Sequence, residues 1–272
     1  MPQEVIQKKG DVKRIKSHIY GLDETMEGGI PEGHAVLVCG SAGTMKSSVC
    51  FNTLYNEALS GTIGLYFSLE QSYVSMLNQF INMGYDFSKV DVIVVSSNID
   101  DIRKKLSVLR QSKKGAIIIS DLGELRKEIK DTKMGSGGDW WVFIRNVLGS
   151  IKKEVDFKLL VIDSLDALYV LSNFEEARTK LFYMFEYFRD LDVTSFLISE
   201  MPIDGKKYSR FEVEDYLADG LILLRLIERY RKVTREISVV KMRGTNCNID
   251  VFTLTYDGHK FKAEYGGRPP LV

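Results

Sequence analysis

The sequence predicts an α/β fold in which a mostly parallel sheet is covered by helices on both faces. From Ala35 to about Ser199, short apolar runs that suit buried strands alternate with helix-length amphipathic segments. A glycine-rich turn joins the first of these strands to the first helix. After Asp219, strand-like segments follow one another without an intervening helix, which predicts an antiparallel extension at the C-terminal side of the sheet.

The individual elements follow from hydrophobic periodicity and from the glycines between them. Strands are expected at 35–40, 63–69, 90–97, 158–164, 194–199, 220–228, 235–244 and 250–256. Helices are expected at 46–60, 71–84, 99–112, 140–155 and 174–191, the fourth of them with Trp140, Phe143, Ile144, Val147 and Ile151 inward. The apolar run "GAIIIS" at 115–120 has no assigned role, and residues 130–138 are predicted to be a flexible loop or an insertion.

Composition restricts the class of protein. The chain has 272 residues, and 37 Lys and Arg balance 37 Asp and Glu, so its overall charge favours neither nucleic acid nor a membrane surface as partner. A polar N-terminus, no apolar run near the roughly 18 residues that span a bilayer, and three sparse cysteines predict a cytoplasmic protein without membrane insertion. Residues 17–272 are expected to form a single domain, preceded by a lead-in over residues 1–16 that is mobile or docks a partner. Scattered histidines and the lack of a C-x-x-C spacing argue against structural zinc.

The segment "CGSAGTMKSS" resembles the phosphate-binding pattern G-x-x-x-x-G-K-[ST], with Gly40, Lys46 and Ser47 in place. In such a loop, main-chain N–H groups and the helix N-terminus face phosphates, the lysine adds charge, and the hydroxyl binds Mg²⁺. The other interpretation is a glycine-rich turn that only caps a helix. The candidate nucleotide-binding residues are Gly40, Ser41, Ala42, Gly43, Thr44, Met45, Lys46, Ser47 and Ser48.

Met45 stands where the pattern has its second glycine. If this position requires a positive φ, a methionine costs roughly 1–2 kcal/mol. If the residue already belongs to the first helical turn, the cost is small. Neither case removes a main-chain donor, since only proline lacks one. We therefore expect nucleotide binding to be retained.

Acidic residues at strand ends supply the remaining chemistry. In "LLVID" four apolar residues lead directly into Asp163, which favours it over Asp121 of "AIIISD" as the second magnesium ligand beside Ser47. Glu70 ends "LYFSLE" and could orient or deprotonate a water molecule. The alternatives are an Asp that caps the next helix and a Glu that is simply solvated.

With these residues placed, the chain resembles the single-module archaeal and bacterial KaiC-like ATPases of the RecA superfamily. The similar segments are "GLDETMEGGIPEGH", the loop itself, "SLEQ", "LLVIDSL", "LADGLILL" and "VVKMRGT", in the family's order from about Tyr20 to Thr245. The resemblance implies a RecA-like P-loop NTPase fold, with ATP and Mg²⁺ as ligands and an ATPase activity. Autophosphorylation is known in the family, so the resemblance also implies a possible autokinase activity.

The resemblance also implies that Lys241 and Arg243 reach the γ-phosphate in a neighbouring subunit of a ring, expected to be a hexamer, with Thr245 nearby at the nucleotide. The alternative is a basic strand edge that discourages aggregation. The implied catalytic residues are Glu70, Gln71, Lys241 and Arg243. Gln71 replaces the second glutamate of the family's pair, and together with Met45 it indicates slow hydrolysis.

The sequence is compatible with three functions. The favoured hypothesis is an oligomeric, Mg-ATP-binding regulatory switch that hydrolyses slowly and has a regulatory protein partner. The second is a DNA-acting recombinase or helicase-like ATPase, because charge and an aromatic ring combine in Lys206, Lys207, Tyr208 and Arg210. The third is a nucleotide-bound scaffold that does not hydrolyse, which Met45 and Gln71 motivate.

Overall fold

The computed structural model describes residues 12–95, 98–110, 112, 114–121, 140–171, 177–201, 207–229, 231–258 and 260–265. Its main feature is a sheet with the strand order β2-β13-β12-β11-β10-β4-β9-β8-β5-β7-β6. The predicted flexible segment at 130–138 and the first eleven residues of the predicted lead-in lie outside the described residues.

One half of the sheet is parallel and contains the strands predicted from the alternating pattern. These strands are β4 (Ala35–Gly40), β5 (Ile63–Ser68), β6 (Asp91–Val95), β7 (Ala116–Asp121), β8 (Leu159–Asp163) and β9 (Thr194–Glu200). The apolar run of unassigned role is β7, which pairs in parallel with β5 and β6. Since β9 and β8 lie between β4 and β5, the chain crosses over two strands when it leaves the first strand–loop–helix unit.

The other half confirms the predicted antiparallel extension. It contains β10 (Gly220–Arg229), β11 (Lys232–Met242), β12 (Phe252–Tyr256) and β13 (Phe261–Tyr265). β10 pairs in parallel with β4 and antiparallel with β11, so it joins the two halves. Four strands were not predicted from the sequence: β13 and the two-residue strands β1 (Arg14–Ile15), β2 (Ile19–Tyr20) and β3 (Ile30–Pro31).

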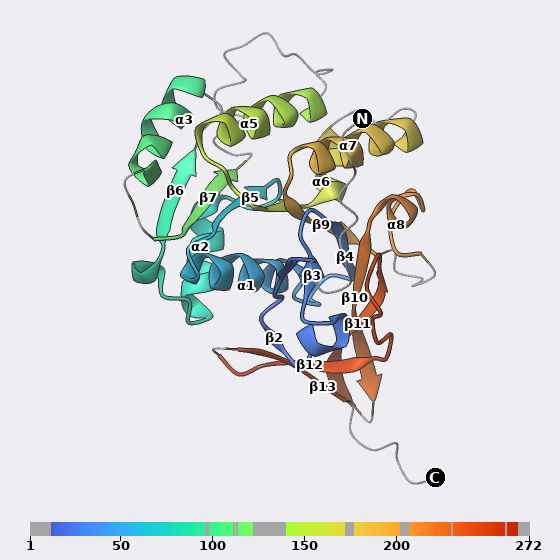
Figure 1. Cartoon of the computed structure of the whole chain (residues 1–272). Helices are drawn as coiled ribbons and strands as arrows, with labels where there is room; N and C mark the ends of the chain where they lie inside the picture. Colours follow the sequence, from blue (N-terminus) through green and yellow to red (C-terminus); the bar gives the residue numbers. More distant parts are fainter. Residues whose placement is uncertain are drawn as a thin grey trace, which may run out of the picture.

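Helices cover both faces of the parallel half, as predicted (Figure 1). One face carries α1 (Lys46–Leu59) and α2 (Tyr73–Asn82), and the other carries α3 (Ile99–Leu106), α5 (Trp140–Glu154), α6 (Leu165–Leu171) and α7 (Ala177–Asp190). The alternation of side chains along each strand separates two apolar cores. In β4, for example, Val36 and Val38 pack with the α1 side, whereas Leu37 and Cys39 pack with the other.

The helices differ from the prediction mainly at their ends. α3 ends at Leu106 and continues as a 3-10 turn over Ser107–Arg110, α7 begins at Ala177, and α6 was missed. In α5, Ile144, Val147 and Ile151 are buried as expected, and Trp141 is buried as well. Phe143 packs against the core while partly exposed, and the Trp140 side chain is outside the described part of the chain.

The last residues of the predicted lead-in pack against the body of the protein. Arg14 and Ile15 form β1, which pairs with β3, and the Ile15 side chain is buried. Within the part of the chain that the structure describes, none of the helices combines the length and the apolar character needed to cross a bilayer.

Candidate functional site

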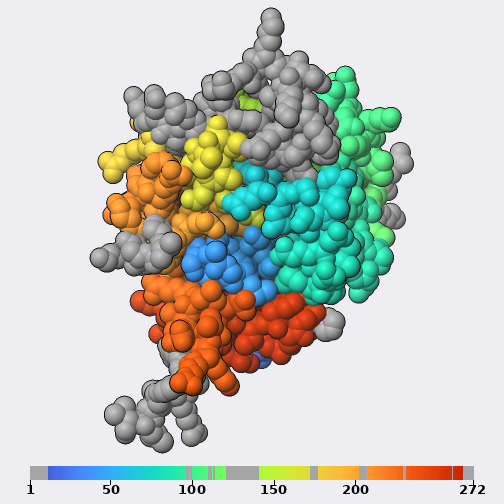
Figure 2. Space-filling view, turned by 180° about the vertical axis from the view of Figure 1, so that it is seen from behind, coloured from blue at the N-terminus to red at the C-terminus, as the bar shows by residue number. Residues whose placement is uncertain are grey.

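The loop of residues 40–47 joins β4 to α1 and borders a cavity of about 430 Å³. Residue 40 must be glycine, because a β-carbon there would lie 2.4 Å from the carbonyl oxygen of Leu224. The Lys46 ammonium donates hydrogen bonds to the carbonyl oxygens of Gly40 at 2.9 Å and Ser41 at 3.0 Å. Figure 2 shows one face of the molecule, on which an early part of the chain, in blue, is exposed between a later segment in cyan and the C-terminal half in orange.

Most of the predicted loop residues face this cavity. Its lining includes Ala42, Gly43, Met45, Lys46, Ser47 and Ser48. Thr44 is fully buried instead. Its hydroxyl donates a hydrogen bond of 2.8 Å to the Ser41 carbonyl oxygen, which stabilises the conformation of the loop.

Met45 adopts a left-handed conformation, with φ 74° and ψ 28°, immediately before the first residue of α1. Of the two alternatives for this position, the structure therefore selects the strained one, at a cost of roughly 1–2 kcal/mol. The Met45 side chain is half-buried and packs against the core between α1 and the sheet, which offsets part of this cost.

Asp163 ends β8 and its carboxylate lines the same cavity. It accepts a hydrogen bond of 2.5 Å from the Tyr66 hydroxyl, and Ser47 lines the same cavity. Burial raises the pKa of Asp163, although the hydrogen bond from Tyr66 and the nearby Ser47 lower it, and the nearby Glu70 raises it further. The predicted pair of Ser47 and Asp163 is thus brought together, whereas the side chain of the alternative, Asp121, lies outside the described part of the chain.

Glu70 follows β5 and also lines the cavity. One of its carboxylate oxygens accepts a hydrogen bond from the Ser164 hydroxyl, next to Asp163 in the chain. Gln71 is exposed, and it is not among the described residues that line the cavity. The Gln71 main chain is bound to the Ser68 hydroxyl, which fixes the turn after β5.

The cavity contains residues that sequence reasoning missed. Glu200 ends β9 and stands opposite Gly40 in the sheet register, so its place follows from strand pairing that the sequence does not reveal. Arg235 lies on β11, and its Nε donates a hydrogen bond of 3.1 Å to the Gly43 carbonyl oxygen. Gln79 and Met83 reach the cavity from α2 and its C-cap.

Lys241 and Arg243 do not contribute to the cavity of their own chain among the residues described as lining it. The Lys241 ammonium donates to the carbonyl oxygens of Asp215 at 2.8 Å and Ala218 at 2.7 Å. Burial and the neighbouring Arg243 lower the pKa of Lys241. The Arg243 guanidinium donates to an Asp219 carboxylate oxygen at 2.8 Å.

Thr245, predicted to contact nucleotide, is likewise outside the described lining of this cavity. Its hydroxyl oxygen accepts a hydrogen bond of 2.9 Å from Arg14. Arg14 also forms an ion pair of 2.9 Å with Glu27, so Thr245 takes part in fastening the N-terminal segment.

The residues considered for DNA binding are largely occupied within the chain. Lys207 forms an ion pair of 2.8 Å with Glu212, and the Arg210 guanidinium lies 5.8 Å from the centre of the Phe211 ring. Tyr208 is half-buried and packs against the core. Lys206 lies outside the described residues.

The oxygen donors of Ser47 and Asp163 fit Mg²⁺, which prefers a few carboxylate and hydroxyl ligands supplemented by phosphates. A buried carboxylate whose pKa is raised also gains from a nearby cation. Within the described residues, no group of three or more His, Cys, Asp or Glu could hold a metal ion alone. Such an ion would therefore depend on phosphate oxygens for its remaining ligands.

A parallel sheet with this loop after β4, and with carboxylates at the ends of β5 and β8, defines the class of RecA-like P-loop ATPases. A family model described as "ATPase: KaiC" matches residues 15–259. The chain belongs to this KaiC ATPase family and is a nucleotide-binding ATPase of the KaiC-like type.

Individual relatives agree with this family. A UPF0273 protein of Saccharolobus solfataricus is 30% identical over 238 residues, which cover 88% of this chain and 78% of that protein. The circadian clock oscillator protein KaiC 1 of Synechocystis is 26% identical over 259 residues, covering 93% of this chain and 44% of that protein. The crystal structure of a KaiC-like protein from Pyrococcus horikoshii matches with a TM-score of 0.69 and 26% identity, covering 93% of this chain and 99% of that one.

Proposed function

We propose that this chain binds Mg-ATP in the cavity above the 40–47 loop and hydrolyses it slowly as an oligomeric regulatory switch. The observation that carries the proposal is the convergence of Lys46, Ser47, Asp163 and Glu70 on one cavity from three separate strand ends. The main-chain amides of the loop and the Lys46 ammonium would bind phosphate oxygens. This set of groups is what phosphoryl transfer requires, since its catalysis depends on positioning and charge neutralisation.

Ser47 and Asp163 would hold the metal ion. Magnesium, when bound, neutralises phosphate charge. The Tyr66 hydroxyl fixes the orientation of the Asp163 carboxylate through its hydrogen bond. Glu70 would accept a proton from the attacking water, and the hydrogen bond from Ser164 keeps its carboxylate at the cavity.

Slow turnover is part of the proposal. The family's second glutamate position holds Gln71, which is outside the described lining and carries no carboxylate. Of the carboxylates that line the cavity, Glu70 is the one to which we assign the role of base. A slow ATPase suits a switch or timer better than a motor, because its nucleotide state persists long enough to be sensed by a partner.

A phosphate-release assay tests the role of Glu70. The substitution Glu70→Gln is expected to lower the steady-state rate by about 100-fold or more while Mg-ATP binding persists. Gln71→Ala is a matched control at the next residue and should change the rate by less than about threefold. Equal phosphate release by the wild type and Glu70→Gln would remove Glu70 from the mechanism.

Lys241 and Arg243 would act on nucleotide held by a neighbouring copy. Since neither residue lines the cavity of its own chain, a role at the phosphates needs a second subunit, as in a ring, which we propose to be hexameric. Each active site would then combine the cavity of one chain with the two cations of its neighbour.

Mixed assemblies test this sharing. At each interface one subunit supplies the cavity, which Glu70→Gln inactivates. The other subunit supplies the cations, which Lys241→Ala inactivates. Each variant alone should be inactive, whereas an equimolar mixture should regain up to about a quarter of the wild-type rate, because random pairing gives that share of complete interfaces. A mixture as inactive as its components would contradict the shared site.

A further inference from the structure

The two cations of the proposed shared site are held by a very short helix, α8 (Glu214–Leu217). The carbonyl oxygens of Asp215, Tyr216, Leu217 and Ala218 all accept hydrogen bonds from cationic side chains. Lys241 donates to the carbonyl oxygens of Asp215 and Ala218. Arg243 donates to that of Tyr216 at 2.8 Å, and Arg189 donates to that of Leu217 at 2.6 Å. Four consecutive carbonyl groups thus fix three positive charges at the carbonyl end of a helix, where cations are favoured.

Asp219 completes this arrangement just after α8. Its carboxylate accepts hydrogen bonds from Arg243 at 2.8 Å, from Arg189 at 3.3 Å and from the Ala35 amide at 3.1 Å. Burial alone would raise the pKa of Asp219, but these hydrogen bonds outweigh it and lower the pKa. Arg243 is therefore held both by a charged carboxylate and by the helix.

The other end of α8 is fixed by Glu214, whose side chain is 0% exposed. One Glu214 carboxylate oxygen accepts from the Tyr169 hydroxyl at 2.9 Å, and the other accepts from the Ser209 hydroxyl at 2.7 Å and the Val213 amide at 3.1 Å. Burying a carboxylate costs free energy that only such a set of donors compensates. The network ties α8 to α6 through Tyr169 and to the chain that follows β9 through Ser209.

We propose that Glu214 is a positioning residue for hydrolysis in the neighbouring subunit. It anchors α8, and the α8 carbonyls set where the Lys241 ammonium and the Arg243 guanidinium lie. Two of the three N–H donors of Lys241 are used by the carbonyl groups of Asp215 in α8 and of its C-cap, Ala218, so the direction of the third is fixed by that helix end. The inference rests on the proposed function, because it needs these cations to act at a neighbour's phosphates.

The kinetic test compares Glu214→Gln with the wild type in phosphate release. A shift of about 1 Å in a catalytic group can cost about 100-fold in rate. We therefore expect kcat to fall by about 10- to 100-fold. KM for ATP should stay within about twofold, because the cavity of each chain remains intact. Tyr169→Phe, which removes one donor to Glu214 and no other group, should lower kcat in the same direction even if Glu214→Gln fails to fold.

A matched control is Asp23→Asn. Asp23 is a half-buried carboxylate that accepts hydrogen bonds from the amides of Ser17 at 2.7 Å and His18 at 3.2 Å, and it lies far from α8 in the chain. This variant should change the free energy of unfolding without a selective loss of kcat. An equal loss of kcat in Asp23→Asn would overturn the assignment, since general destabilisation would then explain the effect.

Mixed assemblies separate positioning from structural damage. Glu214→Gln mixed with Glu70→Gln should regain activity, because Glu70→Gln supplies intact cations to the Glu214→Gln cavity. Glu214→Gln mixed with Lys241→Ala should not, because both variants are defective on the cation side. Rescue in both mixtures, or a wild-type kcat in Glu214→Gln and Tyr169→Phe, would overturn the role of Glu214.

The same mixtures distinguish this role from the shared site itself. If Glu70→Gln and Lys241→Ala complement each other while Glu214→Gln is fully active, only the role of Glu214 is wrong. If Glu70→Gln and Lys241→Ala fail to complement, the shared site is wrong, and the role of Glu214 falls with it.

Discussion

At the scale of single residues, Met45 replaces the second glycine of the usual phosphate-loop pattern, yet the loop keeps its conformation. The residue adopts the left-handed conformation that glycine would provide, and its half-buried side chain packs on the core beside α1. The main-chain amide of residue 45 is retained, so the loop keeps its phosphate-facing donors. The departure therefore affects stability more than chemistry.

Substitutions at Met45 test this explanation. Met45→Ala keeps the strain and loses the packing, whereas Met45→Gly loses the packing and relieves the strain. We expect the glycine variant to be more stable than the alanine variant by about 1 kcal/mol, the reverse of their order at ordinary helical positions. Urea denaturation measures the difference, and a more stable alanine variant would contradict the left-handed conformation.

Asp163 illustrates a cost that function imposes on one residue. Burial raises the pKa of Asp163, so the folded state is penalised when this carboxylate is ionised. Asp163→Asn should raise the unfolding temperature of the nucleotide-free protein at neutral pH and abolish magnesium-dependent ATP binding. This gain in stability should shrink as pH falls through the raised pKa of Asp163 toward about 4, because protonated Asp163 is uncharged like the asparagine that replaces it. Calorimetric unfolding at several pH values measures it, and a gain that is constant with pH would count against ionised Asp163 as its source.

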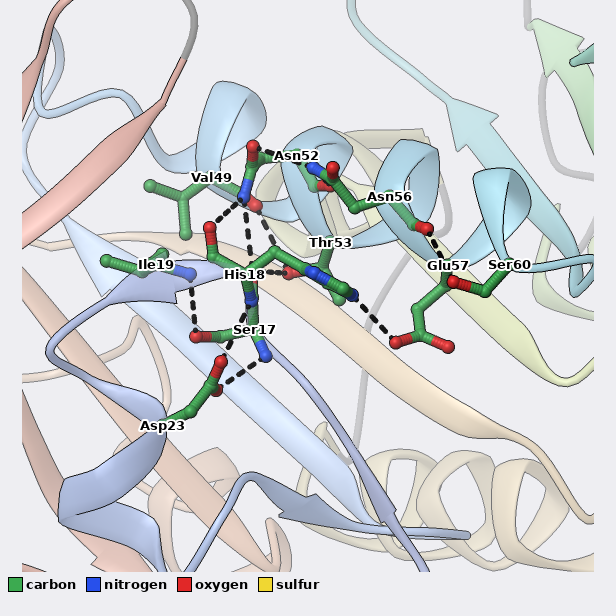
Figure 3. A network of polar contacts seen from close by, with 10 residues as sticks. All are labelled: Ser17, His18, Ile19, Asp23, Val49, Asn52, Thr53, Asn56, Glu57 and Ser60. Atoms are coloured by element: carbon green, nitrogen blue, oxygen red, sulfur yellow. Dashed lines mark hydrogen bonds and ion pairs between the residues drawn. The ribbon is translucent and has the colours of Figure 1, made fainter. Parts of the chain in front are cut away.

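At the scale of elements, the N-terminal segment is fastened to α1, the helix that follows the loop (Figure 3). Asn52 is buried on α1, and its amide donates to the carbonyl oxygens of Ser17 at 3.1 Å and His18 at 3.0 Å. The neighbouring Thr53 hydroxyl donates to Ser17 as well, at 2.9 Å. His18 closes the other side with a 2.8 Å contact to Glu57. The segment before β3 thus helps to hold the helix that carries the loop.

This fastening predicts a large effect from one buried amide. Asn52→Ala removes the side-chain donor of the His18 carbonyl and one of the two donors of the Ser17 carbonyl, and it should destabilise the protein by about 1–3 kcal/mol. Asn56→Ala, one turn later on the same helix, removes a half-buried amide whose hydrogen bonds within the described residues go to Asn52, and it should cost less than about 1 kcal/mol. Chemical denaturation compares the two variants. Equal losses would mean that the contacts to Ser17 and His18 contribute little.

The sequence was informative where an element is long or where its chemistry is local. Hydrophobic alternation predicted the parallel strands, and the apolar run before Asp163 identified the strand that carries it. β1, β2 and β3 have two residues each, too few to show any period. α6 begins two residues after Asp163 and continues an apolar run, so its helical period was hidden.

Within the site, the loop and the carboxylates of Asp163 and Glu70 were predictable because each lies at or just beyond the C-terminal end of its own strand. Glu200 and Arg235 were not, because their place depends on which strands are neighbours in the sheet. Sequence periodicity identifies strands but not their order. The same reason hides the contacts of Lys241 with α8, which join residues more than twenty positions apart.

At the scale of the whole molecule, the proposal couples nucleotide binding to assembly. If Lys241 and Arg243 contact the neighbour's nucleotide, Mg-ATP adds contacts to the interface and must stabilise the oligomer by linkage. Light scattering on dilution should show dissociation at a lower protein concentration with Mg-ATP than without it. The double variant Lys241→Ala/Arg243→Ala should show no such shift. An equal shift in the wild type and the double variant would place the coupling elsewhere.

The central claim is that the cavity bordered by the 40–47 loop holds Mg-ATP. Calorimetric titration of the wild type and of Lys46→Ala with Mg-ATP tests it most directly. The wild type should give a saturable heat of binding, and Lys46→Ala should bind about 10- to 100-fold more weakly, the effect of losing one charged donor to phosphate. A wild-type protein that gives no heat and no rise in unfolding temperature at high Mg-ATP concentration would contradict the claim.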